Sequence, residues 1–347
     1  MQSGYPMRVQ DDRALGRYVD VTHENRLERD VDELLGGLTE EELDLVVRIN
    51  HVVAAFTEKI YGRKLFATGS LIRAINVLRH IQGLNPGRKL TVLEIGPGTG
   101  YLGGLLLLRG HNYVATDVTQ AMYIYQNHLW NHLAPGKVHD LATVDAKIAG
   151  LLSGNGPCAV HIPYWKYLAL FDEETPPFRV DLVTANHVLC EMPEYGRAYT
   201  IRLARRLVST EPGAHVFVFE GWGYPTVHPV HVWGQFRAAG LEIRHNDDRT
   251  TVVSVAQGVR EPGPLSRLRL RVGMKAQRIL RRPASLPDAL VVRDAKLTTQ
   301  IRDIRRSCAA EAKYNSVSVT SALKRELDVP SLASPDEKFA RFVGLTL

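Results

Sequence analysis

The residues best suited to chemistry in this 347-residue chain lie in one stretch, LTVLEIGPGTGYLGGLLLL, at 90–108. A β-branched apolar segment leads into a glycine-rich turn and then into a leucine-rich segment, which is typical of a strand–turn–helix nucleotide site. Gly96, Gly98 and Gly100 would let the backbone turn sharply and approach a ligand closely. Glu94 places a carboxylate two residues before the first glycine, at the end of the expected strand.

Counted from Gly96, the spacing of the turn does not match two common phosphate sites. From Gly96, the dinucleotide fingerprint G-x-G-x-x-G would need its third glycine at 101, where Tyr101 stands, and the turn has no P-loop sequence. The carboxylate of Glu94 would also repel a pyrophosphate, whereas it suits a ligand that presents a cation. The turn therefore indicates a ligand with a cationic group.

The elements that must position these residues alternate between strands and helices from 90 to 258. We expect strands at 91–95, 112–116, 158–162, 180–185, 214–220, 241–245 and 250–256, and helices at 99–109, 119–132, 140–152, 194–209 and 228–239. Such alternation predicts an α/β fold with a mostly parallel sheet and helices on both faces. A short polar turn before the last strand predicts that this strand is antiparallel.

Two further regions flank this predicted domain. Residues 1–89 are expected to form a helical N-terminal cap region, in which Thr39 and Glu42 have the spacing of a capping box. Residues 259–347 are expected to form a basic, partly helical C-terminal extension. Its 18 basic and 9 acidic side chains favour an acidic partner or a solvated basic surface equally well.

The string VLEIGPGTG resembles motif I of the class I S-adenosylmethionine (SAM)-dependent methyltransferases, which have a Rossmann-like fold. In that family the loop wraps the amino acid portion of SAM, which carries an ammonium group. Asp117 ends the second strand, 21 residues after Gly96, and the resemblance implies that it binds the ribose hydroxyls; a helix N-cap is the local alternative. Ile162 or a nearby backbone group would contact the adenine. The cofactor-binding residues implied are Glu94, Gly96, Pro97, Gly98, Thr99, Gly100, Asp117, Val118, Ile162 and Asn186, with S-adenosylhomocysteine as the product.

Transfer of a methyl group to a hydroxyl needs a base, and His187 is the first candidate. It follows the fourth of the strands expected above, at the edge of the sheet where α/β proteins bind ligands. Glu191 would orient the imidazole if a helical turn had begun. His228 and His231 are further catalytic candidates, although either could simply belong to a helix start.

The wider strings YLGGLLLLRGHNYVATDVTQAMYIYQNHLW and NHVLCEMPEYGRAY resemble bacterial sugar O-methyltransferases of natural-product pathways. The resemblance implies a small-molecule acceptor, sugar-containing or anionic, that is methylated on a hydroxyl. Candidate substrate residues are Tyr61, Arg63, Tyr164, Trp165, Glu220 and Trp222, and the aromatic residues Tyr123, Tyr125 and Trp130 could also line a sugar site or belong to the core.

Other functions stay open at this point. An RNA methyltransferase would use the basic extension, but no aromatic residues interleave with its arginines, and nucleic acid is not expected as a partner. An N-methyltransferase on a small molecule and a non-catalytic SAM-binding protein are further alternatives. An NAD-dependent oxidoreductase is disfavoured because the chain has no Tyr-x-x-x-Lys pair.

The composition of the chain indicates its cellular location and whether it binds a metal. The sequence predicts no membrane span and no signal peptide, and three distant cysteines argue against a disulfide framework, so we expect a cytoplasmic protein. Asp247 and Asp248 are the only adjacent acidic pair near the end of the predicted sheet. They have no ligand set around them, and no metal is predicted. The sequence predicts no oligomeric state.

Overall fold

The computed structural model describes residues 29–62, 64–67, 69–208, 211–223, 227–258 and 286–327. The elements in chain order are η1 (Arg29–Leu35), α2 (Glu40–Tyr61), α3 (Gly69–Leu84), β1 (Thr91–Ile95), α4 (Tyr101–Leu108), β2 (Asn112–Thr116), α5 (Gln120–Leu133), β3 (Val138–Asp140), α6 (Ile148–Leu152), β4 (Ala159–His161), α7 (Tyr164–Ala169), β5 (Leu182–Thr184), α8 (Glu194–Leu207), β6 (His215–Phe219), α9 (Pro229–Ala238), β7 (Leu241–Asn246), β8 (Thr251–Val255), η2 (Asp288–Leu290), α11 (Ala295–Glu311) and α12 (Ser316–Leu327).

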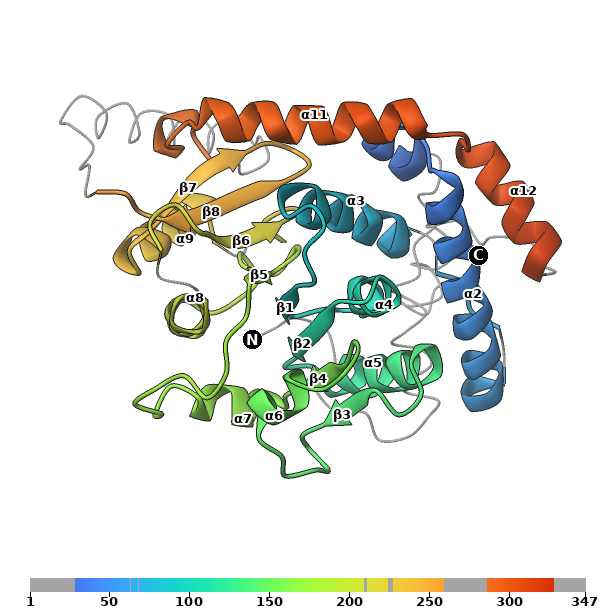
Figure 1. The fold of residues 1–347 in the computed structure, drawn as a ribbon, viewed down its shortest axis with the longest axis horizontal. Helices are drawn as coiled ribbons and strands as arrows, with labels where there is room; N and C mark the ends of the chain where they lie inside the picture. Colours follow the sequence, from blue (N-terminus) through green and yellow to red (C-terminus); the bar gives the residue numbers. More distant parts are fainter. Residues whose placement is uncertain are drawn as a thin grey trace, which may run out of the picture. The chain divides into compact units, whose positions relative to one another are not determined.

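Within the described residues, the strands form an eight-stranded sheet in the order β3-β4-β2-β1-β5-β6-β8-β7 (Figure 1). The pairs β1–β5, β2–β4, β3–β4 and β5–β6 are parallel, and β8 is antiparallel to both β6 and β7. This arrangement confirms the predicted α/β, Rossmann-like fold with a reversed last strand.

The chain divides into two compact units. The first contains the described residues of Met1–Lys89, Gly96–Ala169 and Arg302–Leu347, and it holds β2, β3 and β4. The second contains the described residues of Leu90–Ile95 and Leu170–Ile301, and it holds β1 and β5 to β8. The three sequence regions divided at 89 and 258 stay a prediction.

In the first unit, helix α2 begins as the sequence predicts. The Thr39 hydroxyl accepts a hydrogen bond from the Glu42 N–H, and the Glu42 carboxylate accepts one from the Thr39 N–H, so the capping box is present. Glu42 also forms a buried ion pair at 2.6 Å with Arg79 on α3. Arg79 in turn donates to the carbonyls of Leu35 and Gly37, and so ties α3 to the segment that precedes α2.

In the second unit, a buried arginine fixes the segment that follows β5. Arg197 on α8 is 1% exposed and donates to the carbonyls of Leu189 and Met192. Its guanidinium also donates to the Gln235 side chain of α9. Because a buried guanidinium needs several acceptors, this network holds residues 189–192 firmly against α8 and α9.

The predicted helix at 140–152 is wrong over most of its length. Val138–Asp140 forms strand β3, which pairs with β4, and only Ile148–Leu152 is helical. The Asp140 carboxylate accepts from the Ala142 N–H, and its carbonyl accepts from Thr143 and Val144, which makes a turn. Apolar residues at 141, 144 and 148 imitate helical spacing, but the local hydrogen bonds of an aspartate compete with a helix. The short helix α7 was also not predicted.

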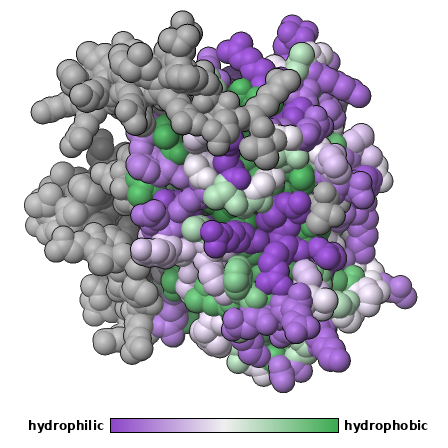
Figure 2. All heavy atoms as spheres, turned by 90° about the vertical axis from the view of Figure 1, so that its left-hand side faces the viewer, coloured by the Kyte–Doolittle hydropathy of each residue, from purple (hydrophilic) through white to green (hydrophobic). Residues whose placement is uncertain are grey.

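On the face drawn in Figure 2, hydrophilic residues dominate the described surface, with apolar residues in small groups between them. The described residues contain no helix that is long and apolar enough to cross a membrane. Large apolar side chains that are exposed include Trp165 at 66% and Val118 at 54%.

Candidate active site

The glycine turn of the first unit depends on left-handed backbone conformations. Gly96, Gly98 and Gly100 have φ angles of 66°, 59° and 75°, which residues with a Cβ rarely adopt. A Cβ on Gly98 would meet no described atom within 4 Å, so the surface of the turn is open there. A Cβ on Gly100 would lie 3.0 Å from the Trp130 ring, whose Nε1 donates to the Gly100 carbonyl at 2.8 Å. The turn is thus packed on one side and open at Gly98.

Asp117 is held against this turn by α5. Its carboxylate accepts from the Thr119 N–H at 2.8 Å and from the Gln126 amide at 2.9 Å, and it also hydrogen-bonds the Gly98 N–H. The same Gln126 amide donates to the Gly98 carbonyl at 2.6 Å. Burial raises the pKa of the Asp117 carboxyl. The side chain of the next residue, Val118, is exposed beside this pre-ordered carboxylate.

Sequence reasoning did not single out Gln126. Its position carried a signal, since it lies one helical turn after Met122 on the buried face of α5. A buried glutamine needs partners for its amide, and here the partners are the turn and Asp117.

In the second unit, three strand ends are joined by one asparagine. Glu94 is the penultimate residue of β1 and is 3% exposed, and its carboxylate accepts from the Asn186 side-chain amide at 3.0 Å. The Asn186 side-chain carbonyl accepts from the backbone N–H of Glu220 at 2.9 Å. Asn186 follows β5 and Glu220 follows β6, so the carboxyl ends of three parallel strands share one hydrogen-bonded chain.

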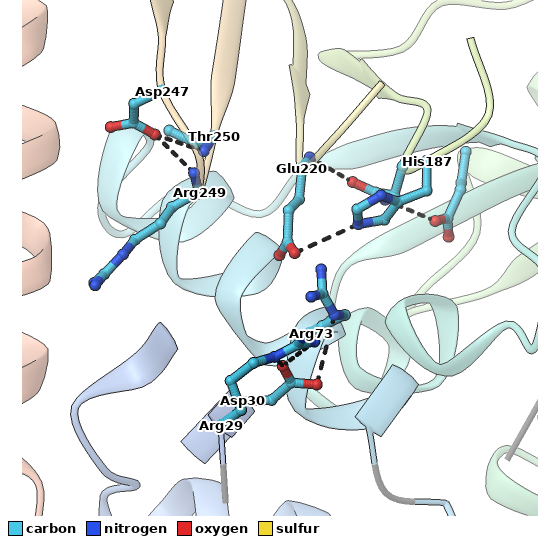
Figure 3. A network of polar contacts seen from close by, with 10 residues as sticks. Arg29, Asp30, Arg73, His187, Glu220, Asp247, Arg249 and Thr250 are labelled. Carbon is cyan, nitrogen blue, oxygen red and sulfur yellow. Dashed lines mark hydrogen bonds and ion pairs between the residues drawn. The ribbon is translucent and has the colours of Figure 1, made fainter. Parts of the chain in front are cut away.

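His187 and Glu220 form a histidine–carboxylate pair (Figure 3). The imidazole Nε2 lies 3.4 Å from the Glu220 carboxylate oxygen; the histidine side chain is 45% exposed, whereas that of Glu220 is 2% exposed. The His187 backbone has φ 52°, and its N–H donates to the carbonyls of Glu220 and Gly221. A buried carboxylate facing a half-exposed imidazole is suited to orient the ring.

Two glycines make room for this histidine. A Cβ on Gly221 would lie 2.1 Å from the His187 Cε1, and a Cβ on Gly223 would lie 2.5 Å from the His187 carbonyl oxygen. Both glycines also have positive φ angles. The segment GWG, at 221–223, therefore packs directly against His187, a relation that the sequence shows only as two glycines after a strand.

The catalytic residues expected from the sequence have different surroundings. The helical turn that would place Glu191 over His187 is not formed, because His187 is left-handed and α8 begins at Glu194. His228 is the N-cap of α9, where its Nδ1 accepts from the Val230 N–H at 3.2 Å. His231 is exposed on the same helix. Glu220, expected among the substrate residues, is the carboxylate that reaches the imidazole.

The remaining predicted residues lie in both units. Trp222 is near the histidine pair, since its carbonyl accepts from the Cys190 N–H and its Nε1 donates to Asn246. Tyr61 and Tyr164 are half-buried in the first unit, and burial raises the pKa of Tyr164. Arg63 lies outside the described residues.

Some predicted positions belong to the core. Ile162 is 1% exposed and its N–H donates to the Ala115 carbonyl, so a contact of Ile162 or a nearby backbone group with adenine stays a prediction. Tyr125 and Trp130 are completely buried, so they do not line a sugar site. Asp247 caps the β7–β8 turn by accepting from the N–H groups of Arg249 and Thr250 (Figure 3).

No protein-family model and no curated protein matches the chain. Among solved structures, the chain is similar to a TehB-like SAM-dependent methyltransferase from Corynebacterium glutamicum, with 15% identity, a TM-score of 0.36, and coverage of 60% of this chain and 97% of that one. It is also similar to CalS10, an amino pentose methyltransferase from Micromonospora echinaspora, with 13% identity, a TM-score of 0.37, and coverage of 55% and 92%. The CcbJ methyltransferase from Streptomyces caelestis shares 16% identity, with a TM-score of 0.36 and coverage of 54% and 96%.

Proposed function

We propose that this protein is a SAM-dependent methyltransferase that methylates a hydroxyl of a small polar metabolite, with His187 as the general base. The observation that carries the proposal is the hydrogen-bonded chain from Glu94 through Asn186 to Glu220, which ends at the imidazole of His187. A carboxylate at the strand end before a glycine turn suits a cationic ligand group, and a base dyad two strands away suits the removal of a proton.

The residues present fit SAM as the methyl donor. Within the second unit, the buried carboxylate of Glu94 suits an ammonium group. Within the first unit, the turn is open at Gly98, and Asp117 beside the exposed Val118 suits the hydroxyls of a nucleoside. When bound, SAM supplies an electrophilic methyl group whose bond to sulfur breaks with the electron pair staying on sulfur.

The proton is handled by residues of this chain. If Nε2 of His187 donates to Glu220, the lone pair of the imidazole lies on Nδ1. Nδ1 can then take the proton of the acceptor hydroxyl while the oxygen of that hydroxyl bonds to the methyl carbon. The buried Glu220 carboxylate then faces the imidazolium and stabilises it.

Calorimetric titration with SAM, S-adenosylhomocysteine and NAD tests the donor. We expect both sulfur ligands to bind and NAD not to bind; failure of both sulfur ligands to bind would remove the proposal. Formation of S-adenosylhomocysteine with a panel of sugars, nucleotide-linked sugars, phenols and amines then tests the acceptor. Turnover with amines alone would replace the hydroxyl with an amino group as the acceptor and keep the donor site.

A further inference from the structure

Beyond the dyad itself, we infer that Asn186 is the positioning residue that couples recognition of the methyl donor to the geometry of the base. This inference rests on the proposed function. Asn186 contacts the carboxylate of Glu94, which we assign to binding the methyl donor. It also contacts the backbone of Glu220, whose side chain orients the base, and both contacts lie within the second unit.

The chemistry of the two contacts allows one orientation of the amide. The Glu94 carboxylate accepts hydrogen bonds, so it must face the NH2 group of Asn186, and the Glu220 N–H donates, so it must face the carbonyl. A flipped amide would lose both bonds and place an oxygen against a carboxylate. The two neighbours therefore fix the plane of the side chain between two strand ends.

The burial of its neighbours makes this link consequential. Glu94 is 3% exposed and Glu220 is 2% exposed, so water can replace little of what Asn186 supplies. An unsatisfied buried carboxylate or N–H is unfavourable. A shift of Glu94 would therefore be transmitted through the amide to the Glu220 backbone, whose N–H and carbonyl contact Asn186 and His187 respectively.

The backbone of His187 is held by Glu220, the residue whose N–H binds Asn186. Its N–H donates to the Glu220 carbonyl at 3.1 Å, and its left-handed conformation leaves few alternative positions for the ring. Methyl transfer requires alignment of donor, acceptor and base within a fraction of an ångström. The Asn186 amide binds both the Glu94 carboxylate and the Glu220 main chain, so it can meet this requirement without taking part in the proton transfer.

Asn186→Asp tests the inference because it changes one contact and keeps the other. The new carboxylate can still accept from the Glu220 N–H but repels Glu94. We expect SAM affinity and kcat each to fall by between about 10-fold and 100-fold, the range for losing a hydrogen bond to a charged group. The added charge should also raise the apparent pKa of the kcat profile, which a loss of folding alone would not do. Asn131→Asp, on the exposed face of α5, is the matched control and should behave as wild type.

The double variant Glu94→Gln with Asn186→Asp provides the rescue. The amide introduced at position 94 can donate to the carboxylate introduced at position 186, so the bridge is rebuilt with donor and acceptor exchanged. We expect kcat with saturating SAM to recover at least several-fold relative to Asn186→Asp, while SAM affinity stays low because the carboxylate at position 94 is gone. The comparison of the double variant with Asn186→Asp remains informative if Asn186→Asp folds poorly. In that case the double variant should regain both its folding and its kcat.

Two results would overturn the inference. The first is an Asn186→Asp variant with wild-type SAM affinity and a wild-type pH profile. The second is a folded double variant with no recovery of kcat. Neither result bears on the donor of the wild-type protein, whereas a wild-type protein that binds neither SAM nor S-adenosylhomocysteine would remove the proposed function itself.

Discussion

His187 has a backbone conformation that non-glycine residues seldom adopt, at a φ of 52°. Such strain persists only where neighbouring groups hold it, and here the holders are the Glu220 and Gly221 carbonyls together with the two glycines of GWG. Strain of this kind is expected where a side chain must point in one direction. At the scale of single residues, the site is therefore defined by how His187 is held as much as by its imidazole.

His187→Ala should abolish most turnover without weakening the donor site. A positioned general base contributes about 10²-fold to 10⁴-fold, so kcat should fall by that range while the Kd for SAM stays within about twofold. Steady-state kinetics and calorimetry measure the two quantities. His132→Ala, which removes an exposed imidazole from α5, is the control. Wild-type turnover in His187→Ala would eliminate it as the base.

Gly221→Ala should impair catalysis through the position of the ring. Its Cβ would overlap the His187 imidazole, and a displacement of about 1 Å can lower kcat roughly 100-fold. Gly240→Ala is the matched control, because Gly240 has a similar φ of 73° but an added Cβ there would meet no described atom within 4 Å. Both variants should lose about 1–2 kcal/mol of stability from backbone strain, and only Gly221→Ala should lose kcat. Equal kcat values for the two variants would contradict this account.

At the scale of elements, the C-terminal helices of the first unit are fastened to its N-terminal helices by specific contacts. The Arg305 Nε donates to the His80 Nε2 at 3.1 Å, while the His80 Nδ1 lies 2.7 Å from the Asn76 carbonyl, which requires a neutral imidazole protonated on Nδ1. Asp32 of η1 accepts from the Ser316 N–H and hydroxyl at the start of α12. These long-range bonds join segments more than 200 residues apart.

Gly83→Ala should loosen the attachment of α11 to α3. The added Cβ would lie 2.6 Å from the Ile304 side chain, so the described part of α11 within the first unit must shift. Overpacking of this kind costs about 1–3 kcal/mol. Hydrogen exchange should become faster in residues 302–311, and Tm should fall. Gly150→Ala, whose Cβ would meet no described atom within 4 Å, should neither speed this exchange nor lower Tm. Unchanged exchange in Gly83→Ala would show that this contact is not important.

At the scale of the whole molecule, stability should depend on pH through a buried histidine. His161 is 0% exposed, its Nδ1 lies 3.0 Å from the Asn127 side-chain carbonyl, and its Nε2 has no hydrogen-bond partner among the described residues. Burial holds the pKa of His161 well below its ordinary value of 6.5. The unfolded chain therefore binds this proton more readily than the folded protein does.

The free energy of unfolding should consequently fall as the pH drops below about 6.5. Above that pH the imidazole is neutral in both the folded and the unfolded chain, so His161 no longer makes stability depend on pH. Urea unfolding between pH 5 and 8 measures the slope. His161→Gln removes the titrating group, so its slope over this range should be smaller than that of wild type even if its stability is lower throughout. Parallel slopes for the two proteins would rule out His161 as the source.

Much of the fold could be predicted because its signals are local. The strands β1, β2 and β6 coincide with runs of β-branched or aromatic residues, and α2 begins at a capping box. The turn after β1 is marked by glycines at every second position. The helix predicted at 140–152 failed because Asp140 forms a turn and its strand pairs with β4, a partner about 20 residues away. Edge strands of three residues have too little periodicity to be recognised.

What the sequence determined by itself is the α/β fold and the identity of the residues at the strand ends: Glu94 before its glycine turn, Asp117, and His187. The tertiary structure alone decided which of them meet. Glu220 follows His187 by 33 residues and Asn186 follows Glu94 by 92, yet they form one hydrogen-bonded chain, because parallel pairing brings the carboxyl ends of β1, β5 and β6 to the same edge. Local propensity acts over a few residues, whereas the partner of a buried polar group is selected by the packing of the whole sheet.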